Sequence, residues 1–258
     1  MASQLRTEDL VLAYDKHPVL DGITVNVPDQ QITAIVGPNA CGKSTLLRAM
    51  TRLLTPQSGA AYLHDKPVHK QKTGAVAKSI ALLPQSADTP DGMRVIDLVG
   101  FGRTPHQSPL QQWSAKDEKM VMAALAQVGL QAFADRPVAA LSGGQRQRAW
   151  IAMVLAQDTD ILLLDEPTTF LDLSYQIETL KLLQTLQQDR ARTILMVLHD
   201  INLAARFADH IIAMRDGAVV CQGTPTQVVT EANIDAVYDL SAKVIAGPVG
   251  GAPFVIPL

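Results

Sequence analysis

Short apolar runs alternate with longer amphipathic stretches over most of the chain. Residues 32–36, 161–164 and 193–198 are predominantly apolar, which is typical of strands buried on both faces of a sheet. Residues 145–157 and 173–188 space their apolar side chains at helical intervals instead. Strands that alternate with helices predict an α/β fold, with a mostly parallel sheet covered by helices on both faces.

The stretch before this sheet has a different pattern. Residues 5–13 are β-like, and residues 19–27 alternate apolar and polar side chains. The link Asp15-Lys16-His17-Pro18 has turn chemistry, so we expect a hairpin or a small antiparallel sheet here. A break at residues 55–59 precedes a further strand at residues 61–63.

Residues 86–138 change character, because glycines and prolines separate short helical pieces. Ser114 and Asp117 have capping-box spacing and predict a helix that runs to about Gln127. We therefore expect a helical subdomain over residues 86–138, inside a single domain of residues 1–258. A C-terminal extension, residues 231–258, is expected to end in a small hairpin.

The string Gly37-Pro38-Asn39-Ala40-Cys41-Gly42-Lys43-Ser44-Thr45 fits the phosphate-binding pattern Gly-x-x-x-x-Gly-Lys-Ser/Thr. A predicted strand precedes it and a helical segment follows, which is the context that this pattern requires. Backbone N–H groups of such a loop and the helix dipole bind polyphosphate. Lys43 is expected to reach the outer phosphates, and the Ser44 hydroxyl to ligate Mg²⁺.

Two adjacent carboxylates, Asp165 and Glu166, end the apolar run at residues 161–164. In a nucleotide fold we expect this strand beside the phosphate loop, so that its end points at Mg²⁺ and the γ-phosphate. Asp165 is the expected Mg²⁺ partner, directly or through water. Glu166 is the expected base that polarises the attacking water.

A second glycine-containing turn, Leu141-Ser142-Gly143-Gly144-Gln145, precedes a predicted helix. Its glycines allow the backbone to approach a phosphate, and the helix N-terminus adds its dipole. One nucleotide needs only one such cradle. The second therefore suggests that the γ-phosphate is gripped from two sides, by two chains.

Composition limits the function classes. With 47% hydrophobic and 18% charged residues, the chain has enough apolar side chains for a sizeable core, and its net charge of -3 gives no electrostatic footprint for nucleic acid. No apolar run approaches 18 residues, and the N-terminal residues lack a signal core, so we expect neither a membrane span nor export.

The chain has two cysteines, Cys41 and Cys221, and the first lies inside the phosphate-binding pattern. We therefore expect no structural disulfide and a reducing cytoplasm. Because Cys41 lies near a helix N-terminus and Lys43, we expect a sensitive thiol that favours the thiolate.

Taken together, the motifs resemble the nucleotide-binding subunit of the ATP-binding cassette (ABC) family over nearly the whole chain. Ala40 is a departure, since many relatives have glycine there; the backbone donors remain, so we expect altered loop geometry but retained nucleotide binding. The matching motifs are Tyr14 for the adenine-stacking loop, residues 37–45 for the phosphate loop, Gln85 for the glutamine loop, residues 141–145 for the family signature, residues 161–166 for the acidic strand, Phe170-Leu171-Asp172 for the dimer-contact loop and His199 for the switch histidine.

The resemblance implies an ATPase that uses ATP and Mg²⁺, with the ABC-type P-loop fold, an antiparallel β subdomain and a helical subdomain. It also implies a head-to-tail homodimer, with each ATP between the phosphate loop of one chain and Ser142, Gly143, Gly144 and Gln145 of the other. Gln85 would sense Mg²⁺ and the γ-phosphate, and His199 would hold the γ-phosphate and the attacking water. For Tyr14, an ordinary strand-end aromatic remains the alternative to an adenine platform.

A single cassette without a membrane span implies separate transmembrane permease subunits, contacted by residues 86–138 at the cytoplasmic face of the membrane. A substrate-binding protein would be an indirect partner. The strings Gly102-Arg103-Thr104-Pro105-His106-Gln107 and Glu166-Pro167-Thr168-Thr169-Phe170-Leu171-Asp172-Leu173-Ser174-Tyr175-Gln176 resemble the subfamily that imports ferric siderophores, haem or cobalamin. A ferric siderophore is the favoured substrate, with haem, cobalamin and a metal ion as alternatives.

Two rival protein classes fit the sequence less well. A soluble ABC ATPase acting on ribosomes or DNA would resemble two fused cassettes or carry a long coiled coil, whereas this chain has one phosphate loop and no heptad run. A phosphate-loop kinase would leave residues 141–145 and His199 without an obvious task.

Overall fold

In the computed structural model of the chain, residues 4–14, 17–85, 89–107, 113–169, 171–248 and 250–258 are described. Some predicted features fall outside these ranges. They are Asp15 and Lys16 of the predicted turn, Ser86 at the start of the predicted insertion, and Phe170 of the predicted dimer-contact loop.

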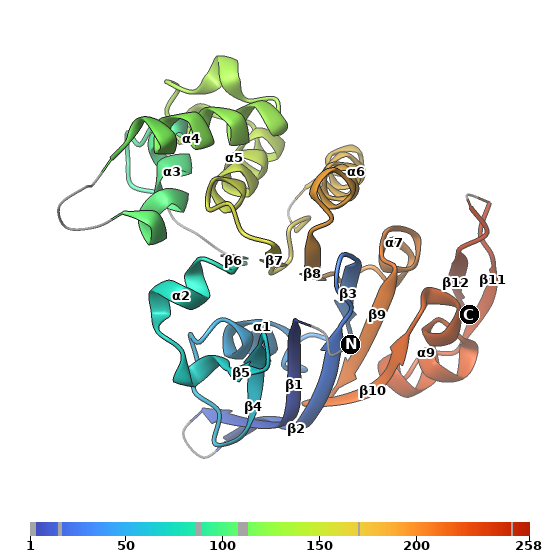
Figure 1. The fold of residues 1–258 in the computed structure, drawn as a ribbon. Helices are drawn as coiled ribbons and strands as arrows, with labels where there is room; N and C mark the ends of the chain where they lie inside the picture. Colours follow the sequence, from blue (N-terminus) through green and yellow to red (C-terminus); the bar gives the residue numbers. More distant parts are fainter. Residues whose placement is uncertain (1–3, 15–16, 86–88, 108–112, 170, 249) are drawn as a thin grey trace.

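A six-stranded sheet forms the centre of the molecule (Figure 1), with the strand order β10-β9-β3-β8-β7-β6. Strands β6, β7, β8, β3 and β9 run parallel to their neighbours, and β10 pairs antiparallel with β9. This confirms the predicted, mostly parallel sheet. The strands are β3 (Ile32–Val36), β6 (Ile80–Leu83), β7 (Ile161–Leu164), β8 (Thr193–Val197), β9 (His210–Arg215) and β10 (Ala218–Gly223).

Both faces of this sheet are covered, as the wholly buried strands β3, β7 and β8 require. One face packs against helices α5 (Gly143–Ala156), α6 (Leu173–Arg190) and α7 (Ile201–Phe207). The other face packs against α1 (Lys43–Met50) and a separate antiparallel sheet. Figure 1 shows these layers, with the antiparallel sheet below the central one.

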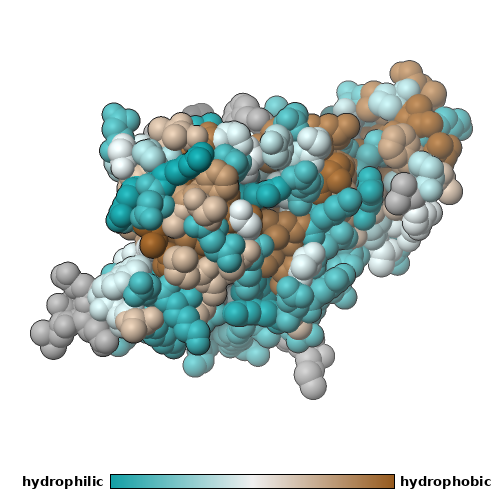
Figure 2. Space-filling model, turned by 90° about the horizontal axis from the view of Figure 1, so that it is seen from above, coloured by the Kyte–Doolittle hydropathy of each residue, from teal (hydrophilic) through white to brown (hydrophobic). Residues whose placement is uncertain are grey.

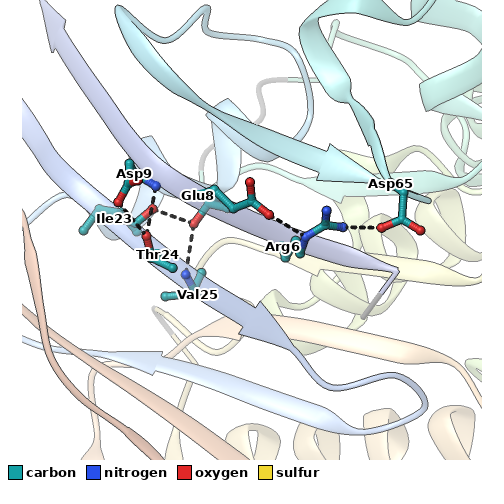
Figure 3. Close-up of polar contacts among 8 residues, drawn as sticks. Arg6, Glu8, Asp9, Ile23, Thr24, Val25 and Asp65 are labelled. Atoms are coloured by element: carbon teal, nitrogen blue, oxygen red, sulfur yellow. Dashed lines mark hydrogen bonds and ion pairs between the residues drawn. The ribbon is translucent and has the colours of Figure 1, made fainter. Parts of the chain in front are cut away.

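The antiparallel sheet has the order β2-β1-β4-β5. Strand β4 begins at Ser58, so the predicted break at residues 55–59 is shorter than expected. Arg6 on β1 donates to Glu8 and to Asp65, as the dashed lines in Figure 3 show. This part comprises β1 (Leu5–Tyr14), β2 (His17–Val27), β4 (Ser58–Leu63) and β5 (Lys66–Pro67), followed by the 3₁₀ turn η1 (Val68–Lys70) and α2 (Thr73–Ala77).

A group of helices lies beyond one end of the central sheet, at the upper left of Figure 1. The predicted capping box is present: the Ser114 hydroxyl accepts from the Asp117 N–H, and the Asp117 carboxylate accepts from the Ser114 N–H. The buried Arg103 guanidinium donates to Asp117 at 2.8 Å and to the Ala156 carbonyl at 2.7 Å. The elements here are α3 (Val95–Gly100), α4 (Ala115–Gln127) and the 3₁₀ turns η2 (Phe101–His106), η3 (Gln131–Phe133) and η4 (Val138–Ala140).

The C-terminal residues contain the predicted hairpin, β11 (Ala242–Ala246) and β12 (Pro253–Pro257), but also the helix α9 (Glu231–Tyr238), which we did not predict. A short helix, α8 (Pro225–Val228), precedes α9. Asn202 on α7 exchanges two hydrogen bonds with the backbone of Val255, which holds the hairpin against the domain. Figure 2 shows apolar side chains gathered at this end of the molecule.

Among the described residues, we find no helix with the length and hydropathy needed to cross a membrane.

Candidate nucleotide-binding site

Parallel strands bring the predicted site residues to one edge of the central sheet. Because β3, β6, β7 and β8 run in the same direction, the segments that follow them share the carboxyl edge. These segments carry the phosphate loop, Gln85, the two acids and His199. Strand β8 lies between β3 and β7, so the acidic strand is not the immediate neighbour of the strand that leads into the phosphate loop.

The phosphate loop connects β3 to α1. Gly37 has φ of 146°, and a Cβ there would lie 2.0 Å from the carbonyl oxygen of Met214, so only glycine fits. Ala40 has φ of 62° in the left-handed region. That conformation costs an L-residue roughly 1–2 kcal/mol, so glycine would suit this position better than alanine.

The ammonium group of Lys43 lies inside the loop. It donates to the Gly37 carbonyl at 2.9 Å and to the Pro38 carbonyl at 2.7 Å, and the side chain is almost fully buried. The two carbonyl groups carry no net charge and do not neutralise the Lys43 ammonium. Its positive charge is therefore available to attract a phosphate.

Ser44 and Asp165 meet across the site. The Ser44 hydroxyl donates to the Asp165 carboxylate at 2.8 Å. Burial raises the pKa of Asp165, and the hydrogen bond from Ser44 acts in the opposite direction. The two oxygen ligands proposed from the sequence therefore lie side by side.

The Glu166 carboxylate is hydrogen-bonded by side chains that include His199, Thr169 and Gln85. His199 Nε2 lies 2.8 Å from one oxygen, and the Thr169 hydroxyl donates to the other at 2.9 Å. Burial pushes the pKa of Glu166 up, but the hydrogen bonds from His199 and Thr169 outweigh it, so the pKa is lowered. Glu166 is therefore an ionised carboxylate at neutral pH.

A cavity of about 370 Å³ opens between the phosphate loop and these side chains. This volume is within the range typical of small-molecule sites. The cavity brings together most of the residues predicted to hold the phosphates and to act on them. Its lining residues are Val19, Asn39, Ala40, Gly42, Lys43, Ser44, Thr45, Gln85, Glu166 and His199.

The remaining predicted residues lie elsewhere in the chain. Tyr14 is exposed at the end of β1 and does not line the cavity. Ser142 caps α5 in a reciprocal capping box with Gln145, and its side chain is exposed. Asp172 caps α6 by accepting from the Tyr175 N–H at 3.0 Å.

Sequence reasoning overlooked Thr169 and Val19. Thr169 lies within the string quoted for the subfamily resemblance, three residues after Glu166, yet its hydroxyl contact depends on the turn after β7. Val19 comes from β2 of the antiparallel sheet, and nothing in the local pattern marked it as part of a site.

The prediction of a thiolate at Cys41 is wrong. The side chain is 3% exposed, and burial raises the pKa of the thiol despite the opposing charge of Lys43, whose Nζ lies 3.8 Å from Sγ. Desolvation outweighs the nearby cation because Cys41 is part of the buried hydrophobic cluster that includes residues of α1 and the antiparallel sheet.

The fold and the site together define a P-loop ATPase. Residues 20–169 match the family model of the ABC transporter, and the chain belongs to this family as an ATP-binding subunit.

Curated relatives cover almost the whole chain. It is 47% identical over 98% of its length to the achromobactin transport ATP-binding protein of Dickeya dadantii, covering 94% of that protein. It is 48% identical over 99% of its length to the ferric enterobactin transport ATP-binding protein of Escherichia coli, again covering 94%. A cobalamin import ATP-binding protein of Halobacterium salinarum is 39% identical over 93% of this chain and 60% of its own length.

Solved structures agree with this fold. A metal-chelate type ABC transporter in an inward-facing conformation superposes with a TM-score of 0.87 at 28% identity, covering 100% of this chain and 98% of that one. A dimeric bacterial ABC transporter cassette superposes with a TM-score of 0.75 at 26% identity, covering 85% and 98%.

The burial of Cys41 makes its reactivity testable. In a Cys221→Ser variant, we expect iodoacetamide to modify Cys41 more slowly in the native chain than in the same variant unfolded in urea, because burial raises the pKa of the thiol and shields it from the reagent. Mass spectrometry of timed samples gives both rates. Equal rates in the folded and unfolded chain would contradict the burial described above.

Proposed function

We propose that the chain is the ATP-hydrolysing subunit of a membrane importer for a ferric siderophore or a related iron chelate. One observation supports the ATPase activity in this proposal. The ionised Glu166 carboxylate contacts His199, and both side chains line the same cavity as Lys43. The substrate class rests on relatives named for achromobactin and ferric enterobactin, which match nearly end to end at 47–48% identity.

In this proposal the phosphates of ATP lie in the loop of residues 37–45. Lys43 would exchange part of its carbonyl contacts for the outer phosphate oxygens, and backbone N–H groups would bind the rest. Adenine would stack on Tyr14, which is exposed and therefore free to offer a ring face.

The oxygen donors beside the loop suit Mg²⁺. Ser44 and Asp165 would hold the ion, with Gln85 as a further ligand from the cavity wall. When bound, Mg²⁺ neutralises charge on the β- and γ-phosphates.

Hydrolysis would use Glu166 as the base. Its carboxylate takes a proton from the attacking water as the water oxygen bonds to the γ-phosphorus and the bond to the β–γ bridging oxygen breaks. His199 is partly exposed to the cavity, with 44% of its side chain accessible. It would hold the γ-phosphate and keep the water in place.

The second cradle supports a homodimer. Ser142 to Gln145 do not line the cavity of their own chain, and Ser142 and Gly143 at the N-terminus of α5 are exposed. These residues, with Asp172, would therefore complete the site of a second subunit. A related cassette has been solved as a dimer.

The helical part would contact the permease. We propose residues 86–138 as a helical subdomain and residues 231–258 as a C-terminal extension of one nucleotide-binding domain, residues 1–258. Phe101 and Trp113 are exposed and line a surface cavity of about 580 Å³ in the helical part, which offers apolar area to a permease segment. In this proposal the subunit would lie at the cytoplasmic face of the membrane, with a substrate-binding protein as an indirect partner.

Replacement of Glu166 tests the base and the dimer together. Glu166→Gln keeps an acceptor oxygen but takes no proton, so hydrolysis should fall by roughly 10²–10⁴-fold while ATP binding survives. Removing a negative charge beside the γ-phosphate should also favour an ATP-bound dimer, measured as size-exclusion mass with Mg-ATP against Mg-ADP. Glu118→Gln, an exposed change on α4, is the control.

A second change tests the cradle in this background. Ser142→Arg should abolish the ATP-dependent dimer by crowding the partner's phosphate, whereas Ser142→Ala removes only the helix cap. A Glu166→Gln chain that hydrolyses normally contradicts the base assignment. One that binds ATP but stays monomeric contradicts the two-chain site.

Substrate class is tested by uptake. A strain lacking this subunit should lose accumulation of radioactive iron from its ferric siderophore, and the wild-type gene should restore it while the Glu166→Gln gene should not. Labelled cobalamin and haem are supplied in parallel. Loss of cobalamin or haem uptake with intact iron-chelate uptake would overturn the proposed substrate.

A further inference from the structure

One aromatic ring lies against the second glycine of the signature turn. Gly144, in the first turn of α5, is buried, and a Cβ built on it would lie 2.5 Å from Cδ1 of Tyr175 and 2.8 Å from Cγ. Atoms this close to the ring base have little freedom to move aside. The Tyr175 side chain therefore occupies the space beside the Gly144 backbone, and any larger residue at position 144 displaces it.

Tyr175 is itself fixed by the segment proposed to contact the partner subunit. The Asp172 carboxylate caps α6 and accepts hydrogen bonds from the Tyr175 N–H at 3.0 Å and from the Ser174 hydroxyl at 2.9 Å. This cap sets the backbone direction of the first turn of α6. The backbone from which the Tyr175 ring projects is thus held by Asp172.

The same two helices meet once more, one turn further along. Arg148 on α5 donates to Glu178 on α6. Their side chains are 30% and 52% exposed, so solvent weakens this ion pair. The ring of Tyr175 lies against Gly144 itself, so of the two contacts it is the one at the signature turn.

We propose that Tyr175 is a positioning residue that joins the dimer-contact loop to the signature turn within one chain. Through its ring, the segment around Asp172 and the turn of Ser142 to Gln145 would reach the partner's nucleotide as one rigid unit. The N–H groups that α5 offers to the partner's γ-phosphate then keep a fixed place relative to Asp172. This proposal rests on the two-chain site proposed above.

Replacing the Tyr175 ring should weaken the ATP-bound dimer without changing ATP binding by the monomer. In the Glu166→Gln background, Tyr175→Leu should raise the dissociation constant of the ATP-bound dimer at least about tenfold, because the first turn of α5 loses its support. Tyr175→Phe keeps the ring and should behave as the parent. The ATP affinity of the monomer should stay within about twofold, since Tyr175 does not line the cavity. Analytical ultracentrifugation and nucleotide titration give the two constants.

A control variant and a double-mutant cycle of Gly144 and Tyr175 distinguish a positioning role of Tyr175 from general destabilisation of the chain. Tyr62→Leu removes a half-buried ring from β4, far from both segments, and should leave the dimer unchanged even where it lowers the melting temperature. Gly144→Ala alone should weaken the dimer by displacing the ring. Combined with Tyr175→Leu, it should add little further loss, since contacting residues are non-additive.

The outcomes distinguish this proposal from the proposed function. A Glu166→Gln parent that stays monomeric with Mg-ATP overturns the two-chain site, and this proposal with it. A parent that dimerises, together with a Tyr175→Leu variant that dimerises equally well, overturns only the role of Tyr175. Additive losses of dimer stability for Gly144→Ala and Tyr175→Leu would also overturn the role of Tyr175. This conclusion applies even where one of the variants has a lower melting temperature.

Discussion

The nucleotide site depends on one close approach between two backbones. The chain leaves β3 at Gly37, where the position of a side chain is taken by the Met214 carbonyl of the adjacent strand β9. Only glycine, which has no Cβ, can be accommodated at this position. The sheet therefore determines the backbone path of the loop. That course sets where α1 begins and directs the ammonium group of Lys43 onto the carbonyls of Gly37 and Pro38.

Two adjacent acids have different environments, which shift their pKa values in opposite directions. Asp165 is buried against Ser44, and burial raises its pKa. Glu166 has φ of 54°, and its carboxylate contacts His199, whose hydrogen bond helps to lower the pKa of Glu166. Opposite pKa shifts suit the proposed division of labour, in which Asp165 holds the metal ion and Glu166 takes the proton.

Features that are local in sequence were predictable, and features that depend on packing were not. The buried strands, the capping box of α4, the phosphate loop and the terminal hairpin each follow from neighbouring residues. Cys41 was misjudged because its distance from Lys43 is visible in the sequence whereas its burial is not. Gly144 and Tyr175 lie on α5 and α6, which β7 separates in the sequence. No local sequence pattern therefore predicts that the two residues meet.

The central claim is that the loop around Lys43 binds the phosphates of ATP, and calorimetric titration of Lys43→Ala with Mg-ATP tests it most directly. Loss of a charged hydrogen-bond donor should weaken binding by about 1.5–3 kcal/mol, a rise in Kd of roughly 10- to 150-fold. Lys181→Ala, an exposed change on α6, should bind as the wild type does. An unchanged Kd in a Lys43→Ala chain with a native circular dichroism spectrum would contradict the account.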